Sequence, residues 1–178
     1  MEAIFIAGIA IGVILLFVIL ITTMWKRVPQ DKALAVTGLR KRVISGGGGF
    51  VVPLLERTDK ISLENMKIKV RTESAMTEQG VDIRADGVAV IKVKSDKESI
   101  LSAIEQFNTG REQQTIDIIK DTSKDVLEGK LREIISKMTV EEIYKDREKF
   151  ASQVQEVAAV GLATMGLELK AFTIRDIS

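Results

Sequence analysis

The feature that most constrains this chain is an uncharged apolar stretch at its start. Residues Ala3 to Trp25 read AIFIAGIAIGVILLFVILITTMW, without one charged side chain. A helix of ~20 apolar residues crosses the ~30 Å hydrocarbon core of a bilayer, so the stretch predicts a transmembrane segment. A cleaved signal peptide is the alternative, but Glu2 stands where a basic residue is expected and TTMWKR offers no small-x-small cleavage site. We therefore expect a retained anchor over residues 1–27.

The side chains expected to face lipid lie along this segment. They are Ile4, Gly8, Gly12, Leu15, Leu16, Phe17 and Ile19, with Trp25 at the interface. Tryptophan is enriched where hydrocarbon meets headgroups. Gly8 and Gly12 also form a G-x-x-x-G spacing, which lets two helices approach closely, although we interpret both as lipid-facing or incidental.

Basic residues follow the segment, whereas only Met1 and Glu2 precede it. They are Lys26, Arg27, Lys32, Arg40, Lys41 and Arg42. Because short loops rich in lysine and arginine stay on the cytoplasmic side, a single pass with the bulk of the chain in the cytoplasm is expected. An intramembrane hairpin that keeps both ends cytoplasmic is the alternative.

Composition removes several kinds of chemistry. The 178 residues carry 26 basic and 25 acidic side chains, so no net field draws in nucleic acid. The absence of cysteine excludes disulfides, thiolate nucleophiles and S-palmitoylation, and fits a reducing compartment. The absence of histidine removes the commonest general base and zinc ligand. Catalysis by carboxylates, by lysine or by a serine–lysine pair remains open.

The remaining residues, 28–178, predict one α+β domain, strand-rich over 28–97 and helix-rich over 98–178. Alternating apolar residues predict strands at 33–37, 42–45, 60–70, 81–83 and 88–93. The alternation changes phase at Asn65-Met66, which indicates a bulge or bend, and residues 85–87 indicate a turn or bulge. Short connections favour antiparallel pairing.

Helical periodicity dominates the second half. An apolar stripe predicts a helix over 112–138. Thr139 and Glu142 form a capping box that begins a second helix, in which Glu141 and Lys145 are spaced to pair. Gly166 is placed to end that helix in a left-handed conformation. Residues 167–177 predict a closing strand that returns to the earlier sheet.

Two tracts near the anchor are candidates for binding phosphate or lipid. Gly46 to Gly49 cannot cradle phosphate, because no Lys-Ser/Thr and no helix follow, so the tract predicts a flexible turn between two strands. The run FVVPLL after it is either a buried core strand or a patch that dips into the bilayer. The apolar candidates are Phe50, Val51, Val52, Leu54 and Leu55, and the basic residues around them, which would face anionic headgroups, are Arg40, Lys41, Arg42 and Arg57.

No catalytic, cofactor-binding or metal-binding residue is predicted, and we expect no enzyme. The capping box explains Glu141 and Glu142, and Glu78 near Asp82 indicates solvated surface. An acidic stripe on the helix over 112–138 favours a solvated or subunit-contacting face over a divalent-ion site. The stripe comprises Asp117, Asp121, Asp125 and Glu128.

Four blocks of the sequence resemble the flotillin family of the stomatin–prohibitin–flotillin (SPFH) superfamily. In chain order they are GGGGFVVPLLE, KISLENMKIKVRTESAMTEQGVDIRADGVAVIKV, VLEGKLREIISKMTVEEIYKDREKF and MGLELKAFTIRDI. The most specific parts are residues 77–81, 127–129 and 138–144. Together the blocks span nearly the whole region after the anchor.

The resemblance implies an SPFH (Band 7) domain of two lobes at the cytoplasmic face of a membrane. It also implies a homo-oligomer, a ring or cage that delimits membrane microdomains, with membrane lipids and other membrane proteins as partners and no enzymatic activity. Bacterial members carry an N-terminal membrane segment, whereas eukaryotic members use acylated cysteines that this chain lacks. A bacterial plasma membrane is therefore expected.

The chain departs from the flotillin pattern at its end, because the family's long C-terminal coiled coil does not follow Ser178. A truncated form, or a short variant with weakened assembly, would account for this. Two other functions stay open: a regulator of a membrane-bound protease, as in the prohibitin branch, and a lipid-binding module.

Overall fold

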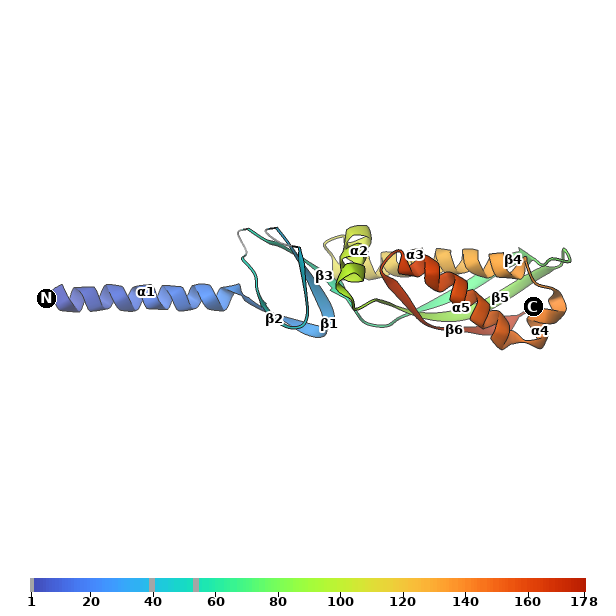
Figure 1. Cartoon of the computed structure of the whole chain (residues 1–178), viewed down its shortest axis with the longest axis horizontal. Helices are drawn as coiled ribbons and strands as arrows, with labels where there is room; N and C mark the ends of the chain where they lie inside the picture. Colours follow the sequence, from blue (N-terminus) through green and yellow to red (C-terminus); the bar gives the residue numbers. More distant parts are fainter. Residues whose placement is uncertain (1, 39–40, 53–54) are drawn as a thin grey trace.

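A long helix leads directly into two small antiparallel sheets that further helices cover (Figure 1). The computed structural model describes residues 2–38, 41–52 and 55–178. The helix, α1 (Glu2–Met24), projects away from the rest of the molecule, with the N-terminus at its free end. Strand β1 begins at Trp25, the residue after the helix ends. No linker therefore separates the apolar helix from the first sheet.

The first sheet contains β1 (Trp25–Thr37), β2 (Arg42–Phe50) and β3 (Arg57–Ser62), in the order β2-β1-β3. All pairs are antiparallel. The β1–β2 ladder has a large bulge, because Val28 faces Gly47 whereas Ala33 already faces Ser45. Pro29 lies in this bulge, where its missing N–H removes no ladder hydrogen bond.

The second sheet contains β4 (Met66–Met76), β5 (Asp82–Val93) and β6 (Leu167–Ile177), in the order β4-β5-β6. The chain between β5 and β6 forms α2 (Lys97–Phe107), α3 (Glu112–Ile135), α4 (Val140–Lys145) and α5 (Arg147–Ala163). Of these, α3 packs against β4 and α5 against β6, and the two helices also contact each other (Figure 1). The result is the expected α+β domain with a closing strand.

One apolar core runs through both sheets, and strand β1 belongs to it on one face only. Ala33 and Ala35 face this main core, together with residues of the second sheet and of α3 and α5. Leu34 and Val36 face the opposite way, into a smaller cluster with Val28 and Val51. Successive strand residues point to opposite faces, so an uninterrupted apolar run is needed where both faces are covered.

One predicted feature of the first half is wrong, and for a second the structure selects one of two alternatives. Gly46–Gly49 is not a turn between strands: the tract lies inside β2, where Gly47, Gly48 and Gly49 are paired with β1 and Gly46 lies at the bulge. The phase change at Asn65-Met66 is a bend rather than a bulge within one strand, because β3 ends at Ser62 in one sheet, the chain bends at Glu64, and β4 begins at Met66 in the other sheet. An alternation that restarts in a different phase here marks a change of sheet.

The region around 85–87 is a bulge rather than a turn. The strands expected at 81–83 and 88–93 are one strand, β5, which starts at Asp82. Its ladder with β6 shifts register between Asp86 and Gly87, which matches the bulge alternative. The closing strand occupies 167–177, as predicted, and pairs with β5.

The helix predictions are confirmed in outline. The capping box is present, with Thr139 accepting from the Glu142 amide and Glu142 accepting from the Thr139 amide. However, the helix expected after it is divided at Asp146, which caps α5 by accepting a hydrogen bond from the Lys149 amide. The preceding helix, α3, ends at Ile135 rather than at residue 138.

Helix α2 has no counterpart among the sequence-based predictions. Its signals are present: Asp96 caps it by accepting from the Ser99 amide. Ile100, Ile104 and Phe107 then recur at helical spacing and are buried. The sequence pattern does not reveal this helix because it is only three turns long and begins four residues after the end of β5.

Two glycines give a matched test of this architecture. Gly166 has φ +75° and a Cβ there would overlap the carbonyl oxygen of Ser99, so we expect Gly166→Ala to lower the free energy of unfolding by about 2 kcal/mol or more. Gly129, inside α3, has nothing within 4 Å of its Cβ position, so Gly129→Ala should raise stability by about 0.5–1 kcal/mol. Thermal unfolding of the full chain in detergent micelles measures both. Equal effects of the two substitutions would contradict the packing of α2 against Gly166.

Candidate membrane-proximal site

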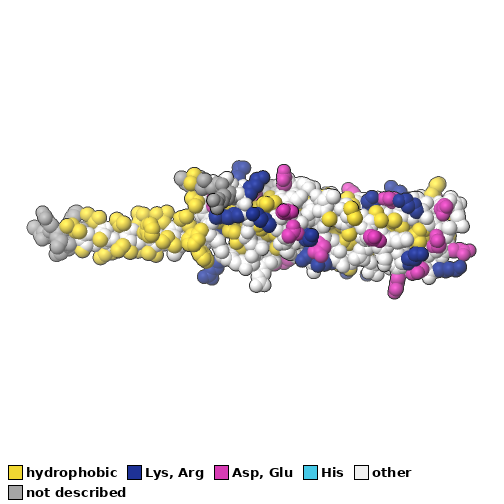
Figure 2. Space-filling model, in the orientation of Figure 1, with side chains coloured by type: hydrophobic (Ala, Val, Ile, Leu, Met, Phe, Trp, Pro, Cys, Tyr) yellow, Lys and Arg dark blue, Asp and Glu magenta, His cyan; other side chains and the backbone are white. Residues whose placement is uncertain are grey.

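Over its described side chains, from Ile6 on, the surface of α1 is largely apolar and exposed, and Met24 at its end is partly buried. Large residues from Ile6 to Ile21 are exposed, among them Leu16 and Phe17. In Figure 2 the described part of this helix is a largely yellow rod that ends at the body of the molecule. A helix of 23 residues is about 34 Å long, enough to cross a bilayer core. Within the described residues, α1 alone has the length and composition to cross a membrane.

The predicted anchor residues lie on this helix, except Trp25. Leu15, Leu16, Phe17 and Ile19 are exposed, and no atom lies within 4 Å of a Cβ position at Gly8 or Gly12. Ile4 is helical, but its side chain lies outside the described residues. Thr22 and Thr23 near the end of α1 donate to backbone carbonyls of the preceding turn, which satisfies their hydroxyls without water.

An aromatic pair lies at the start of the first sheet, next to the C-terminal end of α1. Trp25 and Phe50 are partners in the β1–β2 ladder, and their ring centroids lie 4.8 Å apart with planes at 88°. Both are about half exposed. The indole also covers Gly48, where an added Cβ would come within 2.8 Å of the ring. The glycine tract therefore gives the tryptophan a flat strand surface to lie on.

The segment after β2 fits neither of its two predicted alternatives as a whole. Its described residues beyond Phe50 form no strand, and Val51 is fully buried in the smaller cluster, whereas Leu55 is 62% exposed. Val52 is partly buried. The Val51 amide donates to the Met24 carbonyl at 3.0 Å, which ties this segment to the last turn of α1. Arg40 and Leu54, also predicted for this site, lie outside the described residues.

An ion pair holds this segment in place. Arg42 Nη2 lies 2.8 Å from Glu56 Oε2, and the Val52 amide donates to the same oxygen at 3.0 Å. Arg42 also donates to the Phe50 carbonyl. The Glu56 side chain is only 4% exposed. Arg42, predicted to face headgroups, therefore has its guanidinium engaged with the protein, while Lys26, Arg27 and Lys41 are exposed.

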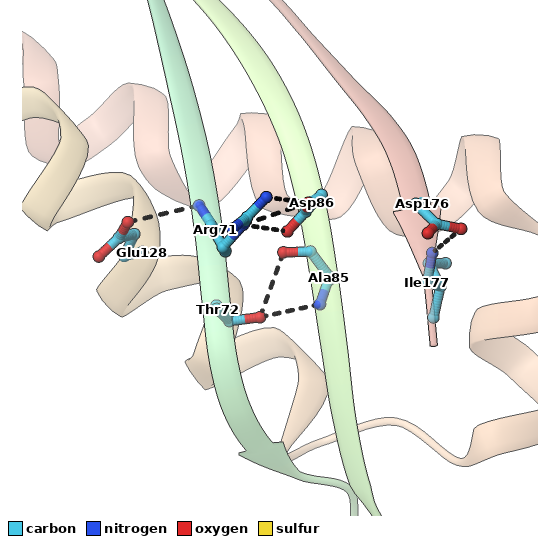
Figure 3. Close-up of polar contacts among 7 residues, drawn as sticks. All are labelled: Arg71, Thr72, Ala85, Asp86, Glu128, Asp176 and Ile177. Carbon is cyan, nitrogen blue, oxygen red and sulfur yellow. Dashed lines mark hydrogen bonds and ion pairs between the residues drawn. The ribbon is translucent and has the colours of Figure 1, made fainter.

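A polar hollow lies at the end of the molecule away from α1, among residues of the second sheet. It measures ≈440 Å³ and is lined by Arg71, Thr72, Glu73, Arg84, Asp86, Asp176 and Ser178. Arg71 and Asp86 are ladder partners and form a forked ion pair at 3.0 Å, which raises the pKa of Arg71 (Figure 3). Thr72 bonds both the amide and the carbonyl of Ala85, where the β4–β5 register shifts. These groups join the two strands at a bulge.

The carboxylates with lowered pKa have structural partners. Lys137 and Lys130 bind Glu133 and lower its pKa to about 2. The Ser99 amide lowers the pKa of Asp96 and the Thr139 amide that of Glu142, both at helix caps. A hydrogen bond from Lys170 lowers the pKa of Glu168. These shifts arise from helix caps and exposed ion pairs.

The acidic stripe on α3 is solvated. Asp117, Asp121 and Asp125 are exposed, and Glu128 accepts from the Arg71 amide and lies 3.8 Å from Lys124. In the described part of the chain, no three acidic side chains come together as metal ligands.

The contact between Trp25 and Gly48 can be tested by emission, because Trp25 is the single tryptophan of the chain. Gly48→Val would push the indole off the strand, so we expect its emission maximum and anisotropy to change in lipid nanodiscs. Gly47→Val is the control, since nothing lies within 4 Å of its Cβ position. An unchanged spectrum for Gly48→Val would contradict this packing.

The ion pair makes a second prediction. Arg42→Met leaves the buried Glu56 carboxylate unpaired, and we expect a loss of about 1–3 kcal/mol in unfolding free energy, with faster hydrogen exchange at the Val52 amide. Adding Glu56→Gln should recover part of this loss. Arg57→Met, at an exposed arginine of the same sheet, is the control. Equal losses for Arg42→Met and Arg57→Met would contradict a specific role for the pair.

Comparison with known proteins identifies a family and several relatives. The family model for the SPFH domain / Band 7 family matches residues 26–178. The flotillin-like protein FloT of Bacillus subtilis (strain 168) is 38% identical over 191 residues, covering 99% of this chain and 37% of FloT. Flotillin-1 of Drosophila melanogaster is 40% identical over 151 residues and flotillin-1 of Homo sapiens 35% over 150, each covering 83% of this chain.

The chain spans about a third of the length of these relatives, 37% for FloT and 34% for either flotillin-1. The match to the family model begins at Lys26, immediately after the apolar helix and at the start of the first sheet. It continues to the end of the closing strand. The chain therefore belongs to the SPFH domain / Band 7 family, among its flotillins.

Proposed function

We propose that this chain is a non-enzymatic scaffold that α1 anchors in a bacterial plasma membrane, with the two-sheet domain on the cytoplasmic face. In this role it self-associates into a ring or cage and organises a membrane microdomain and its proteins. The observation that carries the proposal is the bare apolar surface of α1, joined without a linker to a flotillin-like domain.

Solvation supports the anchoring. The exposed apolar side chains of α1 would be unfavourable in water, at roughly 25 cal/mol per Å² of apolar surface, and are favourable in hydrocarbon. Charge supports the orientation, because Lys26 and Arg27 follow the helix immediately and both are exposed.

The sheets offer surfaces for self-association. In each three-stranded sheet the outer strands, β2 and β3 or β4 and β6, have one edge that no other described strand pairs. Such edges present backbone N–H and C=O groups that can pair with another chain. The exposed acidic face of α3 is a further candidate for subunit contacts.

The absence of catalysis is supported by chemistry. The chain lacks histidine and cysteine. In the polar hollow of the second sheet, Arg71 and Asp86 form a cross-strand ion pair, and Thr72 bonds the backbone at a bulge. A serine–lysine or carboxylate mechanism needs a perturbed group inside a pocket, and the perturbed carboxylates here lie at helix caps or beside lysines.

A topology experiment tests the anchoring, using the cysteine-free chain as background. Glu2→Cys should react with a membrane-impermeant maleimide on intact bacteria, and Ser178→Cys only after lysis. An intramembrane hairpin would shield both cysteines until lysis. Extraction of the wild-type chain by alkaline carbonate would contradict membrane insertion altogether.

The assembly is measured separately. Light scattering of the detergent-extracted full chain should give a mass many times that of one 19.6 kDa subunit. Charge-reversing substitution of Asp117, Asp121 and Asp125 together tests the α3 face, with Glu141→Lys on α4 as an exposed control. A monomer for the wild-type chain would overturn the scaffold proposal.

A further inference from the structure

A basic hollow lies where α1 meets the first sheet. It measures ≈390 Å³ and is lined by Lys26, Arg27, Val28, Pro29, Lys32, Ala33, Leu34 and Lys60. The lining contains four cationic residues and no acidic one. Figure 2 shows dark blue side chains gathered on the body of the molecule, next to the end of the yellow helix.

The chain builds this hollow with the bulge in β1. Lys26 and Arg27 lie on the first residues of β1, before the bulge that contains Pro29. Lys32 follows at its end, where the β1–β3 ladder begins. Lys60 comes from β3, where it is the ladder partner of Leu34. The bulge thus brings the residues after the membrane helix near a lysine more than thirty positions later in the chain.

Three of these cations have no carboxylate partner among the residues that the structure describes. Within the described residues, Lys26, Arg27 and Lys60 form no ion pair within 4.0 Å. Lys32 differs, because its Nζ lies 2.7 Å from Glu112 Oε1, in the first turn of α3. This hydrogen bond raises the pKa of Lys32 and keeps the side chain charged. Like charges that converge without counterions favour binding of an anion.

The position of the hollow selects the anion. Trp25 is the first residue after α1, and Lys26 and Arg27 come directly after it. With α1 across the hydrocarbon core, these residues lie at headgroup level, where lipid phosphates are held. The apolar part of the lining, which includes Val28 and Leu34, suits the glycerol end of a lipid rather than a bare ion.

We propose that this hollow is a binding site for the phosphate of one anionic phospholipid, held by Lys26, Arg27 and Lys60. This inference rests on the membrane anchoring proposed above. It goes beyond diffuse attraction to a charged surface, because Lys60 contributes from another strand. Lys32 lines the hollow and also forms an ion pair with Glu112. Through this ion pair, headgroup binding is linked to the start of α3.

The experiment uses Trp25 as a reporter beside the site. The full chain is reconstituted in nanodiscs of phosphatidylcholine and phosphatidylglycerol in equal amounts, with bromine on the acyl chains of one lipid or of the other. Bromine quenches tryptophan by contact, so the ratio of the two quenching efficiencies reports which lipid adjoins Trp25. For the wild-type chain we expect a preference for phosphatidylglycerol of about fivefold or more.

Lys60→Gln should reduce this preference about fivefold, because one cation near an anionic headgroup contributes that much. Lys41→Gln is the matched control: it removes the same charge from an exposed lysine of the same lobe that does not line the hollow. Glu112→Gln releases Lys32 and should strengthen the preference. An equal loss for Lys60→Gln and Lys41→Gln would show diffuse attraction and overturn the proposal.

Soluble glycerol phosphate, added outside the discs, distinguishes a lipid from a free phosphate. Retained preference supports the lipid, whereas its complete loss assigns the hollow to a soluble phosphate compound and overturns the proposal. The headgroup proposal and the anchoring proposal can fail separately. A chain that inserts in the discs but shows no lipid preference would contradict only the headgroup site, whereas a chain that does not insert would contradict the anchoring itself.

Discussion

The direct junction between a lipid-soluble helix and a water-soluble sheet is the constraint on which this structure depends. Met24 ends α1 and Trp25 begins β1, and the hydrogen bond from the Val51 amide to the Met24 carbonyl adds a second attachment. With two backbone attachments and no linker, the depth of α1 in the bilayer sets the height of the first sheet. In the proposed topology this junction would hold Trp25, Phe50 and the basic hollow at the headgroup level, where a flexible tether would leave their position undefined.

The sheet at this junction is too small to be stable alone, and its stability comes from burial on both faces of β1. A three-stranded sheet needs cover on its apolar face. Ala33 and Ala35 supply contacts with the main core, and Leu34 and Val36 with the cluster that includes Val51. The Arg42–Glu56 pair holds the segment that covers this second face. Membrane attachment and core packing therefore share the same strand.

The candidate site was predictable in part. Hydropathy and charge predicted the apolar and basic residues around the anchor, since both depend on local composition, and a role for them toward lipid stays a prediction. The role of Arg42 was not, because a guanidinium that looks free in the sequence finds Glu56 fourteen residues later, through a turn no local pattern specifies. Lys60 was missed for the same reason. It becomes part of the site only through its register opposite Leu34 and the bulge at Pro29.

Local patterns in the sequence were enough to predict the apolar helix long enough to cross a membrane, the α+β class, the capping box at Thr139, the left-handed Gly166 and the closing strand at 167–177. Each follows from short-range physics: uncharged length, periodicity, a side chain that reaches three residues on, and the freedom of glycine at positive φ. Three features required the tertiary structure: the glycine tract is a strand beneath Trp25, the apolar alternation passes from one sheet to another, and three cations without an ion pair among the described residues line one hollow. Those features depend on which strands pair and in which register, and a contact between distant residues is set by packing of the whole core rather than by the residues beside it in the chain.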